Sequence, residues 1–177
     1  MPIKEEVNSK LPPSILRAIL WAVGLIVWDV LVTGLPVIGL VVSFLAFISY
    51  GLFALVRRIR GDANLARRYA VKGLIYFAAS AAIVSGHTLN QKMGAANAER
   101  VIVAVASFHQ DQNRYPLTLK ELVPVYLDEI PRAAVRLSAN HFRYHSDGDR
   151  TQLVWVVVPP YLRKVYDFER EAWQTID

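Results

Sequence analysis

The sequence predicts an α+β membrane protein in which three transmembrane helices precede a small antiparallel sheet, and the third helix extends beyond the membrane to pack on that sheet. Three observations lead to this fold class. Apolar residues make up 54% of the 177 residues and are concentrated in the first half of the chain. Two apolar blocks in that half are each about 20 residues long, enough for a helix to cross a bilayer. The second half alternates apolar and polar residues between turn signals, a pattern typical of strands.

The first two blocks, residues 15–33 and 36–56, are apolar on every side of a helix. A buried hairpin of a soluble protein is the alternative, and it would show one apolar stripe beside a polar face. The connection "TGLP" forms a tight turn and carries no charge. These features predict a membrane hairpin.

Two charged residues interrupt the first block, Arg17 and Asp29. An acid inside a span is costly in lipid and often functional. Asp29 also lies near the predicted outer end of its span, where a carboxylate can reach the membrane surface, and Arg17 can extend to the headgroups at the opposite end. Asp29 is therefore our candidate intramembrane polar residue, with a surface-seeking role as the alternative.

Basic residues set the predicted orientation. Five arginines lie between the second and third apolar segments and are opposed only by Asp62: Arg57, Arg58, Arg60, Arg67 and Arg68. By the positive-inside rule this region is cytoplasmic, which places the N-terminus in the cytoplasm and everything after the third helix outside it. In a two-membrane bacterium the expected location is therefore the inner membrane, with the C-terminal domain in the periplasm. The net charge of +5 then reflects membrane orientation. No aromatic residues interleave with the arginines, so we expect no nucleic-acid partner.

The third apolar segment is weaker and starts at Tyr69, and no helix breaker follows before Gln112. A helix over this range is on the order of 65 Å long and would continue outside the membrane. Its outer part carries an apolar stripe: Ala98, Ile102, Val105 and Phe108. We therefore divide the chain into residues 1–68, a membrane hairpin with a basic cytoplasmic loop, and residues 69–177, a third transmembrane helix continuing into a periplasmic domain. The N-terminal region shows no signal-peptide cleavage site and is expected to be an uncleaved anchor.

The elements after this helix follow from local signals. Tyr115-Pro116 ends the helix, because a residue before proline avoids the α region. Thr118 and Glu121 predict a capping box for a short helix in "LKELVPVYL". The stretch "HFRYHSDGDRTQLVWVVV" predicts a hairpin that turns at Asp147-Gly148. After Pro159-Pro160, "KVYDFEREAWQTI" predicts a further strand or hairpin.

The segment "SFHQDQNRYPLTLKELVPVYLDEIP" resembles the region after the first helix of type IV pilins and type II secretion pseudopilins. An aromatic residue, Phe108, precedes Tyr115-Pro116 by seven positions, and Leu122, Tyr126-Leu127 and Ile130-Pro131 follow in the family's order. The resemblance covers roughly residues 90–158. The chain departs from the family in its two additional upstream spans, in the lack of an acid in the third span, and in the lack of a C-terminal calcium loop.

The resemblance implies a pilin-like fold and a non-enzymatic role in the assembly or regulation of a type IV pilus or type II secretion system. Partners would be inner-membrane lipid and pilin, pseudopilin or assembly-platform proteins. The alternative is a membrane sensor or transporter accessory whose periplasmic domain binds a ligand or partner. The residues expected to bind a partner share the outer helix stripe and the segment after it: Ile102, Val105, Phe108, Tyr115, Pro116 and Tyr126.

The residue types do not favour catalysis. No nucleophile-base constellation or phosphate loop is present in the sequence, and the absence of cysteine excludes thiolate ligands. His141 and His145 share one strand face but lie about 13 Å apart by strand rise, too far for a common metal ion. We therefore expect no catalytic residues, no cofactor and no metal site.

Overall fold

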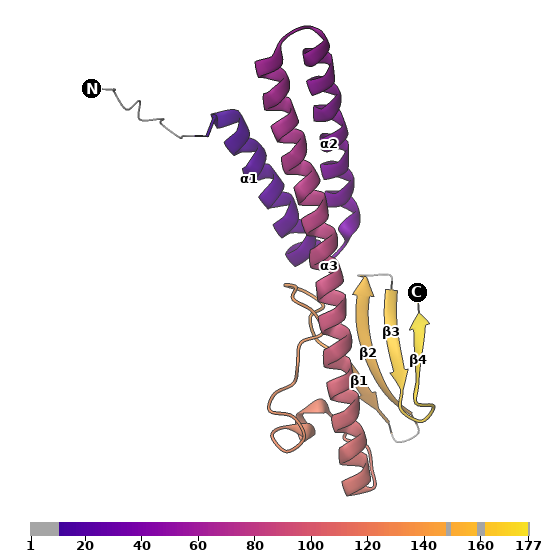
Figure 1. Ribbon diagram of the computed structural model, residues 1–177. Coiled ribbons are helices and arrows are strands. Elements are labelled where there is room, and N and C mark those ends of the chain that lie inside the picture. The colour runs from indigo at the N-terminus through magenta and orange to yellow at the C-terminus, as the bar shows by residue number, and fades with distance from the viewer. Residues whose placement is uncertain (1–10, 148–149, 159–161, 177) are drawn as a thin grey trace, which may run out of the picture. The chain divides into compact units, whose positions relative to one another are not determined.

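The computed structural model describes residues 11–147, 150–158 and 162–176, and it is rich in helix (Figure 1). The helices are α1 (Pro13–Val27), a π-helical segment (Trp28–Thr33), α2 (Pro36–Ile59), α3 (Ala63–Gln112) and one 3₁₀ turn (Leu119–Leu122). Four strands follow: β1 (Arg143–Ser146), β2 (Thr151–Val158), β3 (Leu162–Asp167) and β4 (Ala172–Ile176). The chain divides into two compact units, of which the first contains residues up to Val27 and Val37–Ile83, and the second Trp28–Pro36 and Val84–Asp177.

The first unit is a bundle of α1, α2 and the beginning of α3. Its small core contains Ala18, Ala22, Tyr76 and Ala79. Most other large apolar side chains of α1 and α2 are exposed, among them Trp21 at 70% and Leu52 at 60%. Three helices are long and apolar enough to cross a membrane, beginning at Pro13, Pro36 and Ala63. The prediction of three apolar helices of spanning length is confirmed by the length and composition of these helices.

Helix α3 runs without a break through Gly86 and Gly94 to Gln112, as predicted. Its start differs from the prediction, since it begins at Ala63 and not at Tyr69. The Asp62 carboxylate accepts a hydrogen bond from the Leu65 amide at 3.0 Å and so caps an earlier start. Arg67 and Arg68, which fall in the predicted basic loop before Tyr69, are good helix formers and lie inside the helix. At the other end, Asn113 adopts a left-handed conformation with φ of 52°, which terminates the helix.

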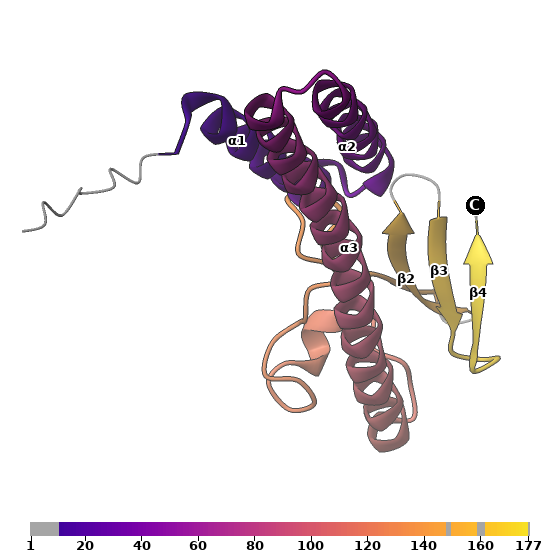
Figure 2. The same ribbon diagram turned by 45° about the horizontal axis from the view of Figure 1, so that its top comes forward.

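The second unit has its core between α3 and the sheet. All four residues of the predicted stripe are buried, and Val101 and Ala104 are buried beside them. Leu153 and Trp155 of β2 and Phe168 after β3 belong to the same core cluster. Figures 1 and 2 show the sheet on one side of this part of α3 and the segment 113–142 on another. The segment contributes Leu122 and Leu127, so it closes the core away from the sheet.

The sheet has the order β1-β2-β3-β4, and every neighbouring pair is antiparallel. The first predicted hairpin is present, with Ser146 opposite Thr151. The amide of Asp147 donates to the Arg150 carbonyl at 3.3 Å, while Gly148 of the predicted turn and the Pro159-Pro160 pair lie outside the described residues. The second hairpin is β3-β4, in which Tyr166 pairs with Trp173 at a ring separation of 5.2 Å.

The predicted short helix is a single 3₁₀ turn. It ends at Leu122 because Val123 precedes Pro124 and is extended, with φ of −97° and ψ of 135°. The predicted capping pair is present: the Glu121 carboxylate accepts from the Thr118 amide at 3.2 Å. The same oxygen accepts from the Leu117 amide at 2.8 Å.

Candidate functional site

Asp29 lies in the π-helical segment between α1 and α2 and is fully buried. Its backbone carbonyl accepts from the Gly34 amide at 2.9 Å, a spacing of five residues that is characteristic of π-helix. The Thr33 hydroxyl lies 3.5 Å from the carboxylate. The side chain is therefore enclosed by other residues of the described chain. Arg17 remains exposed on α1, where its Nε donates to the Pro13 carbonyl at 3.4 Å.

A buried arginine that the sequence analysis did not select lies in the same unit. Arg136 is 7% exposed, and its Nη2 donates to the Val156 carbonyl at 2.8 Å. Desolvation lowers the pKa of this guanidinium from its ordinary value, but arginine stays protonated at neutral pH. Its only sequence signal was a single arginine between apolar residues in "AAVRLSA".

Gly34 lies so close to Arg136 that the position has no space for a side chain. Its φ of 63° is left-handed, and a Cβ built on it would lie 2.7 Å from both Cδ and Nη1 of Arg136. Next to these contacts, the Leu137 amide donates to the Leu31 carbonyl at 3.0 Å. The connection between α1 and α2 is thus attached to the segment that precedes β1.

His87 completes a cluster with these two charges. The Asp29 carboxylate and the Arg136 guanidinium are both close enough to affect the imidazole electrostatically. Among the described residues, the buried Nε2 of His87 and Nε of Arg136 have no hydrogen-bond partner. These three side chains come from segments far apart in the sequence, so no motif could have revealed their proximity.

A cavity of about 10 Å³ adjoins the cluster, lined by His87, Asn90, Arg136 and Trp155 among others. This volume suits one water molecule and no organic substrate. Asn90 also fixes the wall of the cavity, because its Oδ1 accepts from the Val135 amide at 2.7 Å. The arrangement can stabilise buried charge and order a segment, but it has no room for a substrate.

The residues predicted to bind a partner are brought together, mostly in the interior. Ile102, Val105 and Phe108 belong to the core cluster of the second unit, and Pro116 is also fully buried. The helix stripe is covered by the chain's own sheet and is not an open docking surface, because a helix that runs along a sheet buries its apolar face there. Tyr115 and Tyr126 are partly buried against this core.

Each of these tyrosines is held by polar contacts. The Tyr126 hydroxyl donates to Asp111 at 2.8 Å. The Tyr115 ring stacks on His109 at 4.1 Å, and its hydroxyl donates to the Phe168 carbonyl at 3.5 Å. Burial, followed by the nearby Glu169 and Glu171 carboxylates, raises the pKa of Tyr115. Both side chains therefore order the segment that follows α3.

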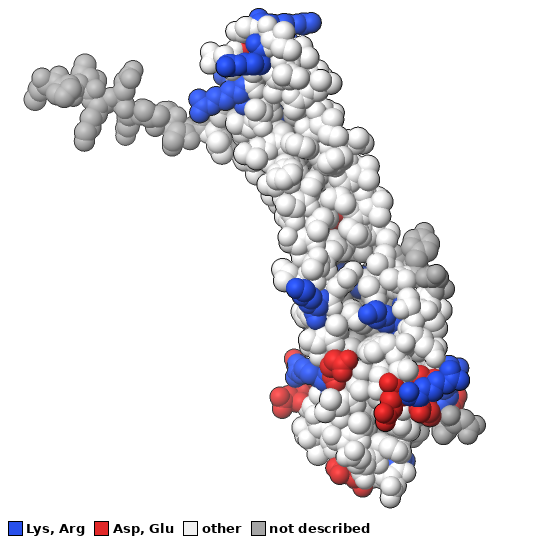
Figure 3. All heavy atoms as spheres, turned by 45° about the vertical axis from the view of Figure 1, so that its right-hand side comes forward, with Lys and Arg blue, Asp and Glu red and all other residues white. Residues whose placement is uncertain are grey.

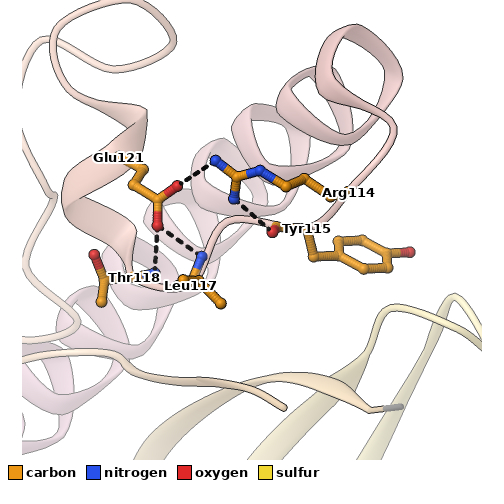
Figure 4. A network of polar contacts seen from close by, with 5 residues as sticks. All are labelled: Arg114, Tyr115, Leu117, Thr118 and Glu121. Carbon is orange, nitrogen blue, oxygen red and sulfur yellow. Dashed lines mark hydrogen bonds and ion pairs between the residues drawn. The ribbon is translucent and has the colours of Figure 1, made fainter. Parts of the chain in front are cut away.

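A polar network joins the end of α3 to the 3₁₀ turn (Figure 4). Arg114 donates to Glu121 at 3.0 Å and to the Tyr115 carbonyl at 3.3 Å. Desolvation opposes ionisation of Glu121, but the hydrogen bonds from Arg114, Leu117 and Thr118 outweigh it and lower the pKa of the carboxyl. The network positions the Tyr115-Pro116 turn.

The outermost strands of the sheet are β1 and β4. Strand β4 has one neighbour, contains no charged residue, and is exposed along most of its length, with Trp173 at 36% and Ile176 at 48%. The opposite edge, β1, is shorter and carries Arg143 and His145. Soluble proteins usually protect sheet edges with charge, proline or a bulge, so β4 is an unprotected edge.

Within the described ranges 11–147, 150–158 and 162–176, no group of three or more His, Cys, Asp or Glu side chains is placed to hold a metal ion. No protein-family model matches the chain, and no curated protein or solved structure matches it.

Proposed function

We propose that this chain is an inner-membrane, pilin-like accessory protein that acts by protein docking in the assembly or regulation of a type IV pilus or type II secretion system. The observation that carries the proposal is α3, a single helix that begins in an apolar bundle and continues as the spine of a small antiparallel sheet. The ordered series that starts at Phe108 near the end of α3 and continues to Pro131 in the segment after the helix adds to it.

The part of α3 in the first unit indicates whether this accessory protein enters a filament or stays in the membrane. Tyr76 and Ala79 pack with Ala18 and Ala22 of α1 in the bundle. A helix face that packs within its own chain is not free to pack on another subunit. Here it is already occupied, which favours a component that stays in the membrane and meets other subunits there.

Docking is assigned to the β4 edge, because the helix stripe is used in the core. An extended segment of a partner can add to an exposed edge through main-chain hydrogen bonds, and exposed side chains such as Trp173 supply selectivity. The chain has no cysteine, so one introduced at Thr175 reports from that site alone.

Cross-linking of Thr175→Cys in cells tests this assignment, with Arg143→Cys on the opposite edge as the matched control. We expect adducts with a pilin, a pseudopilin or a platform protein from Thr175→Cys and few from Arg143→Cys. Deletion of residues 107–177 should also abolish co-purification with these proteins. Co-purification that survives the deletion would refute the proposal.

The topology is tested separately. A reporter enzyme that is active only outside the cytoplasm is fused after Asp177 or inserted at Gly61. We expect activity from the C-terminal fusion alone, because the arginines around Gly61 favour the cytoplasmic side. Activity at Gly61 would contradict a periplasmic domain.

A membrane sensor or transporter accessory is the second candidate, and the buried cluster of Asp29, His87 and Arg136 favours it. Buried charges beside a membrane segment often respond to protons or to a partner. A cell in which the cluster variant Asp29→Asn alters transport, while pili and secretion stay normal, would support this candidate over docking in a pilus machine.

A further inference from the structure

The end of the α2-α3 hairpin concentrates positive charge that has no partner among the described residues. Arg57, Arg58, Arg60, Arg67 and Arg68 lie there, and among the described residues none of their side chains forms an ion pair or hydrogen bond. Figure 3 shows basic side chains gathered at this end, next to a surface that is almost free of charge. Unpaired arginines beside an apolar surface attract an anion that also has an apolar part.

A groove in this hairpin is lined by both arginine and apolar side chains. Its volume is about 420 Å³, and Arg58 from α2 and Arg67 from α3 line it. The remaining lining consists of Leu55 and the small residues Ala54, Ala63, Ala66 and Ala70. Two guanidinium groups on facing helices thus border an alanine-lined apolar floor.

We propose that this groove binds an anionic phospholipid, with its phosphate between Arg58 and Arg67 and one acyl chain along the alanines. Guanidinium groups match phosphate oxygens with paired hydrogen bonds. The alanines leave the width that an acyl chain needs, and each buried methylene adds to binding. A zwitterionic lipid carries a cancelling positive charge and is held less well.

Aromatic residues near the groove are consistent with the headgroup level of a membrane. Tyr69 stacks on Tyr50 at 6.1 Å and lies 5.7 Å from Phe53. The Lys72 ammonium is 5.5 Å from the centre of the Tyr69 ring and 5.6 Å from that of Tyr50. Tyrosine and lysine are enriched where helices meet the membrane surface. An occupant of the groove would therefore have its phosphate among headgroups and its chain in the apolar layer.

Native mass spectrometry of the purified full chain tests the site, comparing phosphatidylglycerol and phosphatidylcholine with identical acyl chains. We expect the wild type to retain phosphatidylglycerol preferentially. The double variant R58Q/R67Q should lose on the order of five-fold in retention for each arginine removed. Its matched control is R60Q/R68Q, which removes the same charge from the same end but from outside the groove, and it should retain the lipid.

A second variant tests the groove without changing charge. Ala70→Leu fills the floor and should reduce retention, whereas Ala70→Ser should not. Equal losses in R58Q/R67Q and R60Q/R68Q would overturn the proposal, because overall charge and not the groove would then decide binding. Unchanged retention in Ala70→Leu, or displacement of the lipid by millimolar inorganic phosphate alone, would overturn it as well. Thermal melts of each variant establish that a loss of lipid does not come from unfolding.

Discussion

The approach of α3 to the sheet predicts a large effect of one added methyl group, at Gly94. An alanine Cβ there would lie 2.5 Å from the Ala133 carbonyl oxygen and 2.6 Å from Cζ2 of Trp155. Neither obstacle moves easily, since Ala133 and Trp155 are buried and the Ala133 amide is bonded to the Asn140 carbonyl at 2.8 Å. Helix α3 must therefore shift away from β2 in the variant Gly94→Ala.

The magnitude follows from two opposing contributions. Alanine in place of glycine within a helix stabilises by about 1 kcal/mol. Overpacking of a rigid core costs about 1–3 kcal/mol, and two obstacles at less than 3 Å place this site at the upper end. The net expectation is a destabilisation of about 2 kcal/mol, equivalent to roughly a 30-fold larger opening constant.

Gly86→Ala is the matched control, because Gly86 lies on the same helix in the same unit. Its Cβ would meet only the Val30 side chain, at 3.1 Å, and a methyl group can give way by a few tenths of an ångström. The helix-propensity gain then offsets the contact, and the variant should be close to neutral. Hydrogen exchange of the β2 peptide 151–158 in the full chain measures the stability of both variants, Gly94→Ala and Gly86→Ala. Equal protection of the two variants would refute the close packing of α3 on Trp155.

Three other substitutions give separate tests. Leu122 is fully buried, so Leu122→Ala should lower the unfolding free energy of the second unit by about 2–5 kcal/mol. Leu117→Ala is the control and should be nearly neutral, because the Leu117 side chain is 68% exposed. Similar losses in the two variants would contradict the placement of the 3₁₀ turn. Arg136→Met removes the hydrogen bond to the Val156 carbonyl and should lower the stability of the second unit by about 1.5–3 kcal/mol. Hydrogen exchange of the Leu137 amide measures this loss, and Arg132→Met at an exposed site is the control. Because the folded pKa of Glu121 lies below its ordinary value, its contribution to stability is present above the unfolded pKa and is lost as pH falls through the folded pKa. Glu121→Gln should therefore flatten the acid side of the pH-stability curve, and an unchanged curve would show that the Arg114 network does not contribute.

The apolar helices and the strands could be predicted from the sequence because their signals are local. An apolar run longer than a bilayer thickness or an alternating run between turns fixes the element with little help from its neighbours. The stripe from Ala98 to Phe108 was predicted for the same reason, and all four of its residues are buried. The start of α3 differs from the prediction because the third apolar segment begins only at Tyr69, whereas the Asp62 cap and the helix propensity of arginine start the helix at Ala63.

By itself, then, the sequence determined which segments are apolar helices, which part is a meander of strands, and which face of α3 is apolar. The packing of α3 on the sheet was also predicted, but only the tertiary structure showed that Ile102, Val105 and Phe108, which were expected to bind a partner, lie in that core. The tertiary structure also placed β4 at the end of the strand order. It also decided that Asp29 lies near His87 and Arg136, and that Arg58 and Arg67 border one groove. The physical reason is that periodicity is encoded over neighbouring residues, whereas the partner of a buried charge or of an apolar stripe is set by contacts between segments that are distant in the sequence.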